Sequence, residues 1–167
     1  SNYSRHLKKL KKLKVVDSEK FIAQELSKNK VVAIFHGKSE IGPRALGHRS
    51  ILANPKFKDN WIRVNKIKSR ENWRPFAPIV LHNKVSEWFT DCPKVSPFML
   101  FTANVSKPKI IPAVTHVDKS SRIQSVNKNV KPIYKILKEF YQITKIPVLL
   151  NTSFNGPGEP IVEKMEE

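Results

Sequence analysis

Apolar and polar positions follow two different periods along the chain, which predicts a mixture of helices and strands. Between residues 130 and 143 the apolar side chains recur every three or four positions, the spacing that lines one face of a helix. Runs that are apolar at nearly every position predict buried strands instead. Such runs occupy residues 30–35, 79–81 and 147–150. The alternation of the two patterns places the fold in the α/β or α+β class.

Weaker patterns predict further elements between these. Asp17 is a candidate N-cap for a helix that extends to about residue 29, with Val16 and Phe21 as a hydrophobic staple. Two more helices and two more strands are predicted, over residues 59–68 and 84–89 and over residues 98–105 and 121–126 respectively.

Length and composition bound the organisation of the chain. A length of 167 residues suffices for one domain with a real core, which we place at residues 15–167, after a basic tail at residues 1–14. No apolar run approaches the roughly 20 residues of a membrane helix, so we expect a soluble protein without membrane contact. The single cysteine, Cys92, has no internal partner, which fits a reducing cytoplasm.

The charge balance is strongly basic. Lys and Arg number 31 against 14 Asp and Glu, which gives a formal net charge of +17. Such an excess indicates an anionic partner, whether nucleic acid, a phosphate ester or an acidic protein surface. A lysine-rich surface without a dedicated partner is the alternative explanation for the lysines.

Arginine and glycine are distributed far more selectively than lysine. Five of the seven arginines lie between residues 44 and 74, and the guanidinium group binds phosphate or carboxylate bidentately, which a lysine cannot do. All five glycines fall within residues 37–47 or 156–158. These two loops and the arginine cluster therefore mark a candidate site.

The loop from Gly37 to Arg49 directly follows a predicted core strand, at the end where open α/β sheets usually bind ligands. Arg44 and Arg49 would supply positive charge there, although a tight turn whose arginines bond helix-end carbonyls is equally compatible. The following basic segment spaces Lys66, Arg70 and Arg74 four residues apart, which predicts one shared helical face. Like charges stacked in this way repel, and a bound polyanion would relieve that repulsion; a solvated basic face is the alternative.

Two more polar clusters follow. His116, Asp118 and Arg122 lie between apolar runs, and a metal site is conceivable there, although two ligands are too few to assign one. Asn151 to Gly156 end a predicted strand with several donors and acceptors, which an ordinary Asn-Gly turn would also explain. A Ser-His-Asp triad can be drawn from Ser153, His116 and Asp118, but no nucleophile elbow supports it.

Taken together, four segments resemble successive blocks of a known domain. In order they read FHGKSEIGPRALGHRSILANP, NKIKSRENWRPFAP, PAVTHVDKSSRIQSV and PVLLNTSFNGPGEPIV. They are similar to the carboxyl-terminal domain of O-carbamoyltransferases, the NodU and tobramycin-carbamoyltransferase family. The resemblance covers nearly all of residues 17–163 and leaves the basic tail outside it.

This resemblance implies a YrdC-like fold, a twisted mixed sheet with flanking helices and a basic concave ligand surface. It further implies that the domain binds Mg²⁺-ATP and carbamoyl phosphate and forms a carbamoyl-adenylate. A preceding transferase domain, absent from this chain, would pass the carbamoyl group to an acceptor hydroxyl. No side chain is assigned as catalytic. The anion-binding roles of the family map onto Arg44, Arg49, Lys66, Arg70, Arg74, Arg122, Asn151, Ser153 and Asn155.

Two other functions fit parts of the same pattern. A non-catalytic RNA- or polyanion-binding module would use the same basic surface, and its binding would fall steeply with salt, unlike binding in a compact pocket. A relative of the threonylcarbamoyl-adenylate synthases would share the fold. The GPRALG and RPFAP blocks favour the O-carbamoyltransferase family instead.

Overall fold

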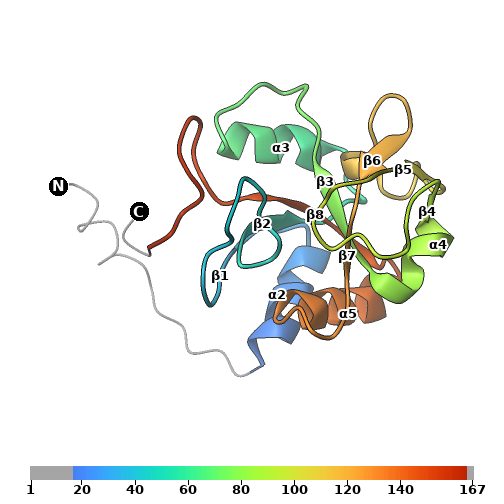
Figure 1. The fold of residues 1–167 in the computed structure, drawn as a ribbon, viewed down its shortest axis with the longest axis horizontal. Coiled ribbons are helices and arrows are strands. Elements are labelled where there is room, and N and C mark those ends of the chain that lie inside the picture. Colours follow the sequence, from blue (N-terminus) through green and yellow to red (C-terminus); the bar gives the residue numbers. More distant parts are fainter. Residues whose placement is uncertain (1–16, 165–167) are drawn as a thin grey trace.

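The computed structural model describes residues 17–164, so the basic tail and Val16 of the expected staple lie outside the described range. Eight strands form a five-stranded sheet, in the order β1-β2-β8-β3-β7, and a three-stranded sheet, in the order β4-β5-β6 (Figure 1). The strands are β1 (Val32–Phe35), β2 (Arg49–Ala53), β3 (Ala77–Leu81), β4 (Phe89–Thr90), β5 (Thr102–Val105), β6 (Ser120–Arg122), β7 (Gln124–Val126) and β8 (Val148–Ser153). In the large sheet only β3 and β7 run parallel, so the sheet is mixed, as the sequence resemblance implied.

The helices lie on both sides of the large sheet. They are α2 (Ser18–Ser27), α3 (Asp59–Ile67), α4 (Val85–Trp88) and α5 (Ile133–Thr144), with short 3₁₀ turns at His82–Lys84 and Pro112–Val114. Helices α2 and α5 pack side by side beneath the sheet, and α3 lies on the opposite side (Figure 1). Helix α5 buries Ile133, Ile136, Leu137 and Phe140 completely, which confirms the helical period. No helix within residues 17–164 is long and apolar enough to span a membrane.

Several predicted elements need correction. The expected strand over residues 121–126 is two strands that belong to different sheets, because the chain passes from one sheet to the other at Ile123. Strand β2 was not predicted, although all five of its residues are buried. Asp17 occupies the predicted N-cap position directly before α2, but its φ is 57° and its side chain makes no capping hydrogen bond.

Strand direction gathers the four sequence blocks at one edge of the large sheet. Strand β8 pairs antiparallel with both β2 and β3, so its carboxyl end lies beside their amino ends. Strand β1 also ends at this edge, where Phe35 pairs with Arg49, and β7 begins there because it runs parallel to β3. The glycine loop, the basic segment before β3, the Arg122 segment and the polar end of β8 therefore meet.

Gly47 closes this edge against helix α5, and its position tolerates no side chain. Its φ is +118°, and a Cβ atom there would lie 2.9 Å from Cγ2 of the fully buried Ile133. We expect Gly47→Ala to lower the free energy of unfolding by about 2 kcal/mol or more, measured by urea denaturation. Gly42→Ala is the matched control, because Gly42 has a similar φ of +114° but open space around it. Equal losses in the two variants would contradict the packing argument.

Candidate functional site

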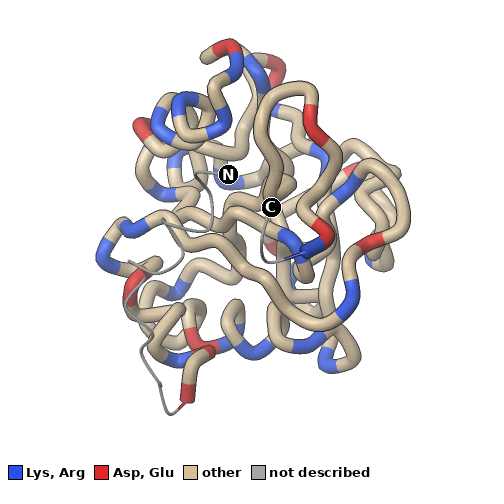
Figure 2. Tube along the Cα trace, turned by 90° about the vertical axis from the view of Figure 1, so that its left-hand side faces the viewer, with Lys and Arg blue, Asp and Glu red and all other residues tan. Residues whose placement is uncertain are grey.

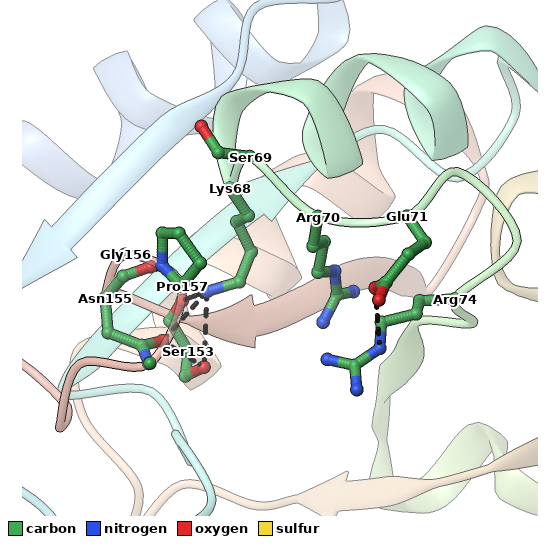
Figure 3. Close-up of a pocket in the computed structure, with 10 residues that line it drawn as sticks. Lys68, Ser69, Arg70, Glu71, Arg74, Ser153, Asn155, Gly156 and Pro157 are labelled. Atoms are coloured by element: carbon green, nitrogen blue, oxygen red, sulfur yellow. Dashed lines mark hydrogen bonds and ion pairs between the residues drawn. The ribbon is translucent and has the colours of Figure 1, made fainter.

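Two adjoining cavities lie at the edge where the four blocks meet. The larger has a volume of about 420 Å³ and joins the segment after α3 to the loop after β8 (Figure 3). It is lined by Lys68, Ser69, Arg70, Glu71, Arg74, Ser153, Asn155, Gly156, Pro157 and Gly158. The smaller has a volume of about 120 Å³ and is lined by Pro43, Arg44, Ala45, Arg70, Pro75, Phe76, Ala77, Met99, Arg122, Asn151, Thr152 and Ser153. Because Arg70 and Ser153 line both, the two cavities form one continuous site.

Lys68 is the most constrained cation of the larger cavity. Its Nζ donates to the carbonyl oxygens of Ser153 (2.6 Å) and Asn155 (2.9 Å) and to Oδ1 of Asn155 (2.8 Å), as Figure 3 shows. The residue is only 5% exposed. Burial, and secondarily the charge of Arg70, lower the pKa of Lys68 to about 8. The ammonium group therefore ties the end of α3 to the loop after β8 within a positively charged site.

The turn at the end of α3 determines which lysine reaches the cavity. The helix ends at Ile67, and Ser69 adopts a left-handed conformation with a φ of 48°, which redirects the chain. The prediction that Lys66, Arg70 and Arg74 share a helical face is therefore wrong. Lys66 is exposed on the outer side of α3, in a shallow groove with Ile62 and Ile67. Within the block NKIKSRENWRPFAP, the lysine that reaches the cavity is therefore Lys68, which was not among the predicted site residues.

Arg70 is held in place by two neighbours and still has a free donor. Its Nε donates to Oδ1 of Asn65 at 2.5 Å, and its guanidinium lies 4.4 Å above the ring of Phe76. Its Nη2 is buried without a partner among the described residues. Burial and the charge of Arg74 lower the pKa of Arg70, while Glu71 opposes the shift. Asn65, which is fully buried, was not predicted, because an asparagine within a helix carries no distinguishing sequence pattern.

Arg74 and Glu71 form the outer wall of the larger cavity. Nε of Arg74 lies 3.2 Å from Oε2 of Glu71, and both side chains are half exposed. Figure 3 shows the guanidinium groups of Arg70 and Arg74 extending from the same segment toward the cavity. Glu71 is the sole carboxylate among the residues that line this cavity, so the site stays strongly basic.

Internal hydrogen bonds shape the glycine loop. Oε1 of Glu40 accepts from the backbone amides of Leu46 and His48, both at 2.8 Å. From the sheet, Nε2 of Gln124 donates to the Leu46 carbonyl at 2.9 Å, and Nδ2 of Asn151 donates to the carbonyl of Ala45 at 2.8 Å. These bonds fix the backbone that follows Arg44, whose exposed side chain lies at the smaller cavity.

Arg49 supports the loop and lines neither cavity. Its Nη1 and Nη2 donate to the carbonyls of His36 (2.8 Å) and Gly37 (3.0 Å), and its guanidinium stacks 3.6 Å from the Phe35 ring. The residue is 2% exposed. Arg49 thus has the structural role that was the alternative to ligand binding. The carbonyls that it binds belong to the loop, whereas that alternative placed them at a helix end. Seven of the nine predicted residues line the cavities, and only Arg49 and Lys66 do not.

The remaining polar cluster, around His116 and Asp118, forms a hydrogen-bonded turn. Ser120 contacts both predicted residues, with its Oγ 2.7 Å from Oδ1 of Asp118 and 3.3 Å from Nδ1 of His116. Ser153 is bound elsewhere, since its Oγ donates to Oδ1 of Asn155 at 2.6 Å. Within residues 17–164, no three His, Cys, Asp or Glu side chains are grouped to hold a metal ion.

Comparison with known protein families identifies the domain. Residues 23–167 match the family described as "Carbamoyltransferase C-terminus". The chain belongs to this family. The carbamoyltransferase C-terminal domain is 42% identical over 151 residues to nodulation protein NolO of Bradyrhizobium diazoefficiens, a match that covers 87% of this chain and 28% of that protein. It is 38% identical over 143 residues to the 3'-hydroxymethylcephem-O-carbamoyltransferase of Amycolatopsis lactamdurans, covering 85% and 27%.

Solved structures show the same fold at low sequence identity. HypF of T. kodakarensis superposes on 92% of the carbamoyltransferase C-terminal domain with a TM-score of 0.64 and 17% identity, over 19% of its own length. A Sua5 variant of P. abyssi superposes on 86% with a TM-score of 0.59 and 14% identity, over 42% of its own length. The domain therefore has the YrdC/Sua5-like fold. It spans only 22 to 28% of the length of three curated relatives, NolO, NolNO and the cephem carbamoyltransferase.

Proposed function

We propose that this domain binds Mg²⁺-ATP and carbamoyl phosphate and forms a carbamoyl-adenylate. The observation that carries the proposal is the juxtaposition of Lys68, Arg70 and Arg74 with the loop after β8 around a cavity of about 420 Å³. This volume lies within the range of about 300 to 1,000 Å³ that small-molecule sites occupy. Family membership supports the proposal, as does the related fold of a HypF structure described as phosphate- and nucleotide-bound.

The chemistry calls for positioning and charge neutralisation rather than a nucleophilic side chain. Carbamoyl phosphate and water yield carbamate and phosphate, and a carbamate oxygen then attacks the α-phosphorus of ATP. The bond from that phosphorus to the bridging oxygen breaks, and pyrophosphate leaves with the electron pair. Both reactants are anions, so Arg70, Arg74 and Lys68 would lower their repulsion and stabilise the leaving group.

Mg²⁺ would enter this site with the nucleotide. The ion prefers oxygen ligands and commonly keeps several waters and substrate phosphates in its coordination shell. Among the residues that line the larger cavity the only carboxylate is that of Glu71, which already pairs with Arg74. The phosphates of ATP and water would therefore supply most ligands of the ion. Glu71 could add a carboxylate ligand if it exchanged its contact with Arg74 for one with the ion.

Transfer of the carbamoyl group would require the part of the protein that this chain does not contain. The related carbamoyltransferases are roughly three to five times longer than the matched segment. A preceding transferase domain would take the carbamoyl-adenylate and deliver the carbamoyl group to an acceptor hydroxyl. In this arrangement the present domain supplies the activated intermediate and the other domain selects the acceptor.

Pyrophosphate release by the purified chain tests the proposal. With Mg²⁺-ATP we expect release that depends on added carbamoyl phosphate, or saturable binding of both ligands if turnover requires the transferase domain. Absence of release and of binding would overturn the proposal and favour the polyanion-binding alternative. Figure 2 shows basic residues on many segments of the described chain, with acidic residues interspersed among them.

A further inference from the structure

Three residues that line the smaller cavity each carry a buried polar side-chain atom with no hydrogen-bond partner among the described residues. Six such side-chain atoms occur among the described residues, and three of them belong to residues that line this cavity. They are Nη2 of Arg70, Nε of Arg122 and Oδ1 of Asn151. Buried polar groups are nearly always hydrogen-bonded, so three unpaired atoms around one cavity indicate a ligand that pairs with them.

The neighbours of Asn151 establish which of its amide atoms is available. Its Nδ2 donates to the carbonyl oxygen of Ala45 at 2.8 Å and lies 3.5 Å from Oε1 of Gln124. Both neighbours are acceptors, because Nε2 of Gln124 is itself used as a donor to Leu46. Exchanging the oxygen and nitrogen of Asn151 would place an oxygen against two acceptors. Asn151, which is 1% exposed and lines the smaller cavity, therefore has an acceptor oxygen without a partner.

The available atoms are complementary to a small planar amide. The two arginine atoms are donors that suit a carbonyl or phosphate oxygen, and Oδ1 of Asn151 requires a donor on the ligand. A volume of about 120 Å³ is small compared with cavities that hold a whole nucleotide. A carbamoyl group has both features, since its oxygen accepts and its NH₂ donates. An acetyl group of nearly the same size and shape has no donor.

We propose that the smaller cavity binds the carbamoyl group and that Asn151 selects it by accepting a hydrogen bond from its NH₂. This inference rests on the proposed function and assigns the selectivity to one atom, Oδ1 of Asn151. Arg70 and Arg122 hold the carbonyl side of the group. Because Arg70 and Ser153 line both cavities, the carbamoyl group lies next to the space assigned to the phosphates of ATP.

Carbamoyl phosphate and acetyl phosphate test the proposal directly, because they differ only in an NH₂ group in place of a methyl group. We expect calorimetry on the unmodified chain to give a dissociation constant for carbamoyl phosphate at least about tenfold lower than that for acetyl phosphate. The difference reflects a buried acceptor that acetyl phosphate leaves unpaired. This comparison needs no variant and is therefore independent of any folding defect.

Two matched variants separate selection from support of the loop. Asn151→Leu removes the acceptor together with the bond to Ala45, whereas Gln124→Leu removes an equivalent bond to Leu46 and leaves the acceptor. We expect Asn151→Leu to reduce the preference for carbamoyl phosphate to less than about threefold. Gln124→Leu should weaken both ligands and keep the preference at about tenfold.

The outcomes distinguish this inference from the function on which it rests. Equal affinities for the two ligands in the unmodified chain, with pyrophosphate release still dependent on carbamoyl phosphate, would overturn the role of Asn151 alone. Retention of the full preference in Asn151→Leu would do the same. Binding of neither ligand would overturn both the inference and the proposed function.

Discussion

Replacing Lys68 by methionine is expected to reduce pyrophosphate release by at least about 100-fold while the domain remains folded. Methionine has a similar length but no charge, so the cavity would lose the ammonium that joins the loop after β8 to the end of α3 and that we propose to act on the bound phosphates. Removing one preorganised electrostatic group from a reaction centre typically costs between about 10² and 10³ in rate. The measurement is the initial rate of pyrophosphate release at saturating Mg²⁺-ATP and carbamoyl phosphate, or ATP affinity if the isolated chain does not turn over.

The pH dependence of binding gives a second readout for Lys68. Burial, together with neighbouring Arg70, lowers the pKa of Lys68 to about 8. Anion binding requires the protonated form of Lys68, which predominates below that pH and whose population falls above it. Affinity should therefore fall by about tenfold per pH unit above pH 8, until the higher pKa of the ligand-bound state is reached. Lys68→Met should lack this decrease, since the titrating group is gone.

Lys66→Met is the matched control for Lys68. It removes the same charge two residues away, but Lys66 is exposed on the outer side of α3. We expect its rate of pyrophosphate release to stay within about twofold of that of the unmodified chain at each pH, because isolated surface charges contribute little interaction energy. Equal losses in the two variants would show that net charge, not the position of Lys68, controls the reaction.

Replacing Arg70 by lysine is expected to weaken ATP binding by about 10- to 100-fold, even though the positive charge is retained. Lysine cannot reproduce the guanidinium, which donates to Asn65 with Nε and belongs to the lining of both cavities. It would also leave Oδ1 of Asn65 unpaired in a buried position, which should lower the free energy of unfolding by about 1 kcal/mol. Calorimetric titration with Mg²⁺-ATP and urea denaturation measure the two effects.

Arg63→Lys is the corresponding control for Arg70. Arg63 lies on α3, seven residues before Arg70, and donates through Nη1 to the carbonyl of Asn29 at 2.8 Å, outside both cavities. Its replacement should leave ATP affinity within about twofold. Unchanged ATP affinity in Arg70→Lys would remove this residue from the proposed site.

Local sequence patterns identified the main elements of the fold but not their pairing. The helix near residues 130–143 and the core strands around residues 79–81 and 147–150 were predicted correctly, because hydrophobic periodicity is a local property. Strand β2 was missed, and the strand over residues 121–126 was assigned as one element. In both cases the assignment depends on which sheet accepts the backbone hydrogen bonds, and those partners lie far away in the chain.

The sequence by itself determined the family, the mixed class of the fold and the four blocks from which the site is built. Arginine and glycine marked those blocks because few positions of this lysine-rich chain use them. Only the tertiary structure decided which cations line the cavities. Lys66 and Lys68 are the same residue type two positions apart. A left-handed turn at Ser69 and hydrogen bonds to residues more than 80 positions later bury Lys68 and not Lys66. The burial and the hydrogen bonds of Lys68 arise from these distant contacts, and a local sequence pattern holds no information about them.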